Sequence, residues 1–97
     1  MNINEMLKQA KKMQSQMELK EKELQKKEFV IEKLGITLTL TGDRKLKSVK
    51  INENLIDPED PETLEDLIIV AFNEAMDKIN MEFDELTNSI PTGSLPF

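Results

Sequence analysis

The hydrophobic residues between positions 3 and 27 recur at the spacing of one helix face. Seven of them fall within about 120° of arc on a helical wheel. No glycine or proline interrupts this segment, and Asn2 or Asn4 suits the position that caps a helix start. We therefore expect a long first helix over residues 3–27. Its apolar stripe consists of Ile3, Met6, Leu7, Ala10, Met13, Met17 and Leu24.

After residue 28 the pattern changes to one that is typical of strands. Residues 29–31 are aromatic and β-branched, and residues 36–41 alternate strictly between aliphatic residues and threonine. Residues 42–45 contain Gly and Asp and predict a tight turn before a third strand over residues 45–51. Strands joined by such short connections form an antiparallel meander. One face of this sheet is apolar and needs a cover.

Two Asp-Pro pairs follow the strands, Asp57-Pro58 and Asp60-Pro61. Both look like helix starts, because Asp is a favoured N-cap and Pro a favoured first helical residue. The carboxylates here match no calcium loop, so we assign them to capping and predict no metal site. The second helix is expected over residues 61–88. The stripe that can cover the sheet consists of Leu64, Ile68, Ala71, Phe72, Ala75, Ile79, Phe83 and Leu86.

The second helix also carries a smaller apolar strip, formed by Leu67, Val70 and Met81. Polar residues separate it from the main stripe on one flank, and one sheet face cannot bury both. An apolar strip left without a cover indicates contact with another protein surface, most commonly an identical subunit. We therefore predict a homodimer with these three residues as interface candidates.

The length of the chain supports the need for a partner. With 97 residues it forms one domain and buries only about 60% of the surface that the unfolded chain exposes, so a lone monomer is marginally stable. We expect the fold class to be α+β, as a single domain over residues 1–90. Residues 91–97 contain two prolines and a glycine without periodicity, and predict a flexible C-terminal tail.

Charge is divided unevenly along the chain. Residues 1–50 carry 12 basic and 7 acidic residues, a net charge of +5, whereas residues 51–97 carry 1 basic and 12 acidic residues, a net charge of −11. Such asymmetry indicates an electrostatic partner for one half. Five lysines share the polar side of the first helix, and the predicted turn and third strand offer a second basic patch. The ridge is Lys8, Lys11, Lys12, Lys22 and Lys26; the patch is Arg44, Lys45 and Lys47.

The residues that most enzymes depend on are absent. The chain has no His and no Cys, which removes the usual general base, the thiolate nucleophile and the nitrogen ligands of metals. The three glycines form no phosphate-binding or dinucleotide-binding pattern. We expect no enzyme, no cofactor and no small-molecule substrate.

No apolar run approaches the roughly 20 residues of a membrane span, so we expect a cytoplasmic protein without a membrane partner.

Several strings resemble the YbaB/EbfC family of bacterial nucleoid-associated proteins, along nearly the whole chain. They are MLKQAKKMQSQM in the first helix, LTLTGDRKLKSVKINENLI in the strands, LEDLIIVAFNEAMDKI in the second helix, and the terminal LPF. The third string is the most specific. The resemblance implies a homodimer whose protruding helices give a tweezer outline, bound to DNA in the bacterial nucleoid.

The leading hypothesis is a homodimer that contacts double-stranded DNA mainly through phosphates, with low sequence specificity. The lysine ridge and the basic patch would supply the electrostatic contacts. The alternative is a protein–protein interaction adaptor, whose acidic second helix would attract a basic protein and be repelled by DNA.

Overall fold

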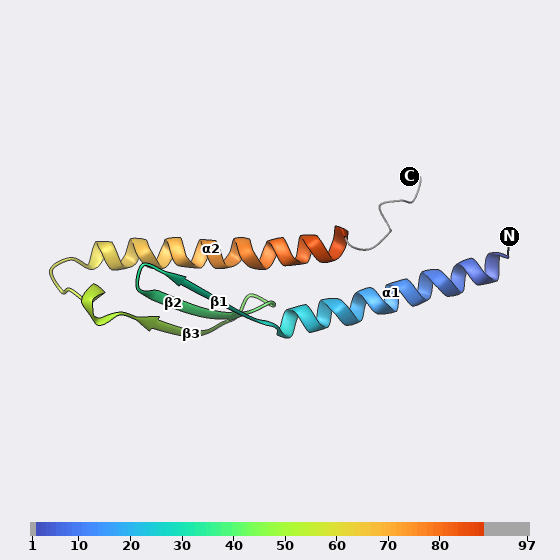
Figure 1. The fold of residues 1–97 in the computed structure, drawn as a ribbon, viewed down its shortest axis with the longest axis horizontal. Helices are drawn as coiled ribbons and strands as arrows, with labels where there is room; N and C mark the ends of the chain where they lie inside the picture. The colour runs from blue at the N-terminus through green and yellow to red at the C-terminus, as the bar shows by residue number, and fades with distance from the viewer. Residues whose placement is uncertain (1, 89–97) are drawn as a thin grey trace.

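The computed structural model describes residues 2–88 as a helix, a three-stranded sheet and a second helix (Figure 1). This order confirms the predicted α+β class. The predicted tail, residues 91–97, and the predicted domain boundary at residue 90 lie outside the described residues. The elements are α1 (Ile3–Lys26), β1 (Glu28–Lys33), β2 (Ile36–Thr41), β3 (Leu46–Ile51), a 3-10 turn η1 (Glu53–Leu55) and α2 (Pro61–Asn88).

The sheet is the predicted antiparallel meander, in the order β1-β2-β3. Leu38 in the central strand pairs with Ile31 on one side and Val49 on the other. Residues directly opposite one another in an antiparallel pair project to the same face. The aliphatic residues of 36–41 therefore form the middle of one apolar sheet face, as the alternation predicted.

The core lies between this sheet face and α2, which packs on β1 and β2. Ala71, Ala75 and Ile79 are the fully buried residues of α2, and the two alanines let the helix approach the strands closely. Their spacing of four residues places them on one helix face. The remaining buried residues come from β1 and β2 and are Phe29, Ile31, Ile36, Leu38 and Leu40.

Helix α1 projects from the end of the sheet and carries no buried residue (Figure 1). The molecule is 72 Å long, and its radius of gyration is 19.8 Å. A compact chain of this length would have a radius of gyration of about 12.5 Å. α1 is therefore an arm rather than part of the core. Within residues 2–88, no helix is both long and apolar enough to cross a membrane.

The helix starts follow the predicted capping chemistry with one exception. The Asn2 side chain accepts a hydrogen bond from the Asn4 amide, and Asp60 accepts bonds from the amide and hydroxyl of Thr63. Asp57 begins no helix, so that prediction was wrong. Its carboxylate accepts from the Glu59 amide at 2.9 Å inside a turn, because the chain turns again before the helix begins at Pro61.

Candidate nucleic-acid interface

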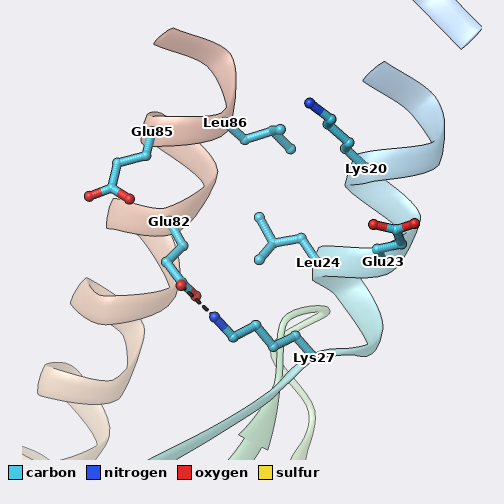
Figure 2. Close-up of a pocket in the computed structure, with 7 residues that line it drawn as sticks. All are labelled: Lys20, Glu23, Leu24, Lys27, Glu82, Glu85 and Leu86. Carbon is cyan, nitrogen blue, oxygen red and sulfur yellow. Dashed lines mark hydrogen bonds and ion pairs between the residues drawn. The ribbon is translucent and has the colours of Figure 1, made fainter. Parts of the chain in front are cut away.

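The five lysines of the predicted ridge are all exposed on α1. Lys26 lies 18 positions after Lys8, or about 27 Å along the helix. The ridge lies opposite Leu24 on the helical wheel, and Figure 2 shows Leu24 pointing across a cleft toward Leu86 of α2. The ridge therefore faces away from α2. Among residues 2–88, none of these lysines takes part in an ion pair, so their ammonium groups are available to an anion.

The predicted basic patch is less uniform. Arg44 lies in the β2–β3 turn, where its Nη2 donates a hydrogen bond to Asn80 Oδ1 and its guanidinium lies 5.2 Å from the centre of the Phe83 ring. Lys47 Nζ lies 2.7 Å from Glu28 Oε1. The Lys45 side chain is 81% exposed, against 61% for Lys47, and its Nζ lies 3.8 Å from Asp43 Oδ2. Arg44 and Lys47 are thus engaged in holding the fold, and Lys45 is the most available.

Lys50 was missed by the sequence reasoning. It is exposed on β3, and it pairs with Thr37, so both side chains lie on the sheet face that α2 does not cover. The signal was present in the sequence. Ser48 and Lys50 alternate with Val49 and Ile51, which places the lysine on the polar face of the strand.

The junction between the arm and α2 is an amphipathic cleft of about 490 Å³ (Figure 2). Lys27, directly after α1, forms an ion pair of 2.5 Å with Glu82 Oε1, and its Nζ lies 5.2 Å from the Phe29 ring centre. The second carboxylate oxygen of Glu82 is buried without a hydrogen-bond partner in the described part of the chain. These contacts join the base of α1 to α2 and help to set the direction of the ridge.

The β2–β3 turn also contacts this junction, through hydrogen bonds to the end of α1. The Gly42 amide donates to the Lys27 carbonyl at 3.0 Å, and the Asp43 amide donates to the Gln25 carbonyl at 3.0 Å. The Thr41 hydroxyl donates to the Asp43 carboxylate, and this bond is the main cause that lowers the pKa of Asp43. The turn is therefore bonded both within itself and to the end of α1.

The three predicted dimer-interface residues do not share one environment. Leu67 is partly buried and packs against the core, whereas Val70 and Met81 are exposed. Phe72, which the wheel placed in the covering stripe, is exposed at the side of α2. α2 rests on the sheet through its small alanine face, with Leu67 packed against the core and Phe72, 37% exposed, at the edge of the contact. No contact in the described residues tests the predicted interface, which stays a prediction.

Comparison with known proteins places this fold in a family. The sequence profile described as the YbaB/EbfC DNA-binding family matches residues 1–94. The chain therefore belongs to the YbaB/EbfC DNA-binding family, as the resemblance indicated. The family is described by DNA binding and not by a catalytic activity.

The relatives at the sequence level are named nucleoid-associated proteins. One from Mycoplasmopsis pulmonis is 64% identical over 97 residues, covering 100% of this chain and 97% of the relative. Another, from Metamycoplasma arthritidis, is 53% identical, covering 98% of this chain and 100% of the relative. A solved structure, the uncharacterized protein HP0035 from Helicobacter pylori, matches with a TM-score of 0.74 over 92% of this chain and 96% of that one. At 14% identity, this likeness shows the fold alone.

Proposed function

We propose that this protein associates with the bacterial nucleoid as a homodimer that binds double-stranded DNA mainly through phosphates, with little preference for sequence. The observation that carries the proposal is a ridge of five exposed lysines on a projecting helix, none of which forms an ion pair with another residue of the part of the chain that the structure describes. Ammonium groups contact the phosphate oxygens of DNA whatever its base sequence. Such contacts fix the position of a protein on DNA without reading bases.

The arrangement of charge supports the same proposal. α2 carries eight acidic residues and one lysine, so it would repel a polyanion. Because the ridge faces away from α2, DNA could approach the lysines without approaching the acidic helix. A dimer would present the ridge twice. The overall charge of −6 is therefore compatible with DNA binding on one side of the molecule.

Fluorescence anisotropy with two labelled duplexes of unrelated sequence, across a series of salt concentrations, tests this function. We expect similar affinities for both duplexes. The logarithm of the binding constant should fall linearly with the logarithm of salt concentration, by about 0.9 per phosphate contacted. The triple variant Lys8→Glu, Lys11→Glu, Lys12→Glu should bind much more weakly and with a shallower slope, because fewer counterions are released.

Lys12→Glu and Lys78→Glu form the matched comparison. Each changes the net charge by the same amount, but Lys12 lies on the ridge and Lys78 on α2. Only Lys12→Glu should weaken binding strongly. Equal effects of the two variants, or a binding constant that does not change with salt, would contradict the phosphate-contact proposal. Capture of a basic protein from nuclease-treated lysate, together with no DNA binding, would favour the adaptor function instead.

A further inference from the structure

The apolar stripe of α1 continues well beyond the part of the helix that packs on the rest of the chain. Leu24 packs against the core at the base of the arm, and Figure 1 shows α1 extending past the end of α2. Nearer the N-terminus, Ile3 is 71% exposed and Met6 is 52% exposed. Large apolar side chains that are exposed along one face of a helix indicate an interaction surface.

The stripe repeats every seven residues, which is the period of a two-stranded coiled coil. In such a heptad, the a and d positions face the second helix. The a positions of α1 are Ile3, Ala10, Met17 and Leu24, and its apolar d positions are Met6 and Met13. We call the outer part of this stripe, which consists of Ile3, Met6, Ala10, Met13 and Met17, the arm seam.

The residues beside the arm seam suit an identical helix as its partner. The e and g positions flank the seam, and those between residues 3 and 17 are uncharged: Leu7, Gln9, Gln14 and Gln16. All charged residues of this stretch occupy b, c or f positions, on the outside of a coiled coil, and they are Glu5, Lys8, Lys11 and Lys12. Two copies can therefore approach along the seam without bringing like charges together.

We propose that the α1 arms of two separate molecules pair through the arm seam as a short antiparallel coiled coil. The pairing itself does not require DNA, and only its effect on DNA binding rests on the proposed function. The lysine ridge lies at b, c and f positions throughout, so it stays exposed when the arms are paired.

The residues in the seam favour the antiparallel direction. A parallel pair sets equivalent positions together, so Lys20, at a d position, would meet its own counterpart and be repelled. Ala10 would also meet its counterpart and leave a gap. In an antiparallel pair the a positions face d positions, which places Met6 opposite Met17 and the small Ala10 opposite the larger Met13. Small residues facing large ones give close packing.

The overlap is short, so the pairing depends on how closely the arms are brought together. From Met6 to Met17 it covers about 12 residues, a length at which helices in water are marginal. Molecules bound side by side on one duplex hold their arms at a high effective concentration. The phosphates also neutralise the lysines that would otherwise keep the arms apart. We therefore expect arm pairing to make binding to long DNA cooperative.

Cysteine crosslinking tests both the pairing and its direction, because the chain has no native cysteine. Met6→Cys and Met17→Cys chains are purified separately, mixed, and treated with a short bismaleimide, with and without a long duplex. We expect a covalent product that contains one chain of each kind, identified by its mass, and more of it with DNA. Each variant alone should give little product.

The matched control is a mixture of Met6→Cys with Leu19→Cys. Leu19 is 59% exposed and lies two positions from Met17, but it occupies a c position on the outside of the seam. This mixture should give little product under the same conditions.

A seam variant provides a second readout on DNA. Met6→Gln with Met13→Gln keeps every lysine, and glutamine and methionine have similar helix propensities. Its affinity for a duplex too short for two molecules should stay within about 3-fold of the wild-type value. On a long duplex its affinity should fall by about tenfold or more, because two apolar side chains no longer pack across the seam. Leu19→Gln is the control and should change neither affinity.

Each outcome decides a different question. A covalent product from Met6→Cys alone would overturn the antiparallel direction, and a mixture that crosslinks no better than the control would overturn arm pairing. Either result leaves the DNA-binding proposal intact if the wild type binds the short duplex. Loss of helical circular dichroism in the Met6→Gln, Met13→Gln variant, at a dilution where arms do not crosslink, would also overturn the pairing. It would show that another part of the same chain covers the seam.

Discussion

Gly42 lies so close to Leu24 that a Cβ atom on the glycine would stand 1.8 Å from the Leu24 carbonyl oxygen. The contact joins the β2–β3 turn directly to the last turn of α1. With the backbone hydrogen bonds from Gly42 and Asp43, it fixes the base of the arm through main-chain atoms. The position of the lysine ridge therefore depends on a residue of the β2–β3 turn.

Gly42→Ala should destabilise this junction. The added methyl group meets backbone rather than a flexible side chain, so the turn and the helix end must move apart, at a cost of about 1–3 kcal/mol of unfolding free energy. Urea unfolding followed by circular dichroism would measure the loss. Lys45→Ala in the same turn is the control, because its side chain is exposed. A stability loss for Gly42→Ala no larger than that of the control would show that the turn yields easily.

Asp60→Ala should destabilise the start of α2. The Asp60 carboxylate accepts bonds from both the amide and the hydroxyl of Thr63, and loss of such a cap costs about 1 kcal/mol. Asp57→Ala is the matched control, since Asp57 caps only a turn before the helix. Thermal unfolding of both variants would compare them. A larger loss for Asp57→Ala would contradict the assignment of Asp60 as the helix cap.

The Asp43 carboxylate should contribute stability that depends on pH. The hydrogen bond from the Thr41 hydroxyl lowers the pKa of Asp43 in the folded state. A lowered pKa means that the contribution is present above the unfolded-state value of about 3.9 and is lost as pH falls through the lower folded value. Asp43→Asn should therefore be less stable than the wild-type chain near neutrality and indistinguishable from it in strong acid.

Urea unfolding between pH 6 and pH 2.5 would measure this difference. Thr41→Val removes the hydroxyl donor while keeping the side-chain shape, so it should abolish most of the pH-dependent advantage of Asp43. A difference between Asp43→Asn and the wild type that is constant across this range would contradict the role of the ionised carboxylate.

The sequence predicted the elements well because each has a strong local period. The alternation of residues 36–41 required a strand with one buried face, and that face holds three fully buried side chains. Proline after Asp60 and the long apolar pattern gave the start of α2 at Pro61. These features depend only on neighbouring residues, so a single sequence contains enough information to find them.

The way in which the elements pack on one another could not be predicted in the same way. A helical wheel shows that α2 has apolar residues on several sides, but it does not show which side rests on the sheet. Ala71 and Ala75 decide this by allowing close approach, so Phe72 is left at the edge. The bond between Arg44 and Asn80 joins residues 36 positions apart, and no local pattern indicates it. For the same reason the sequence could not reveal that Arg44 is engaged while the ridge lysines are not.

The absence of buried residues in α1 has a consequence for local unfolding. The tertiary contacts of α1 described above lie at its C-terminal end, near Leu24, so the N-terminal part of this 24-residue helix is held mainly by its own hydrogen bonds, whereas most helical stability in proteins comes from packing. Amide hydrogens near Met6 should exchange with solvent far sooner than those of Leu38, while the sheet stays intact. Neutralising the lysines with a polyanion relieves their mutual repulsion, so the arm should gain helical order as it binds.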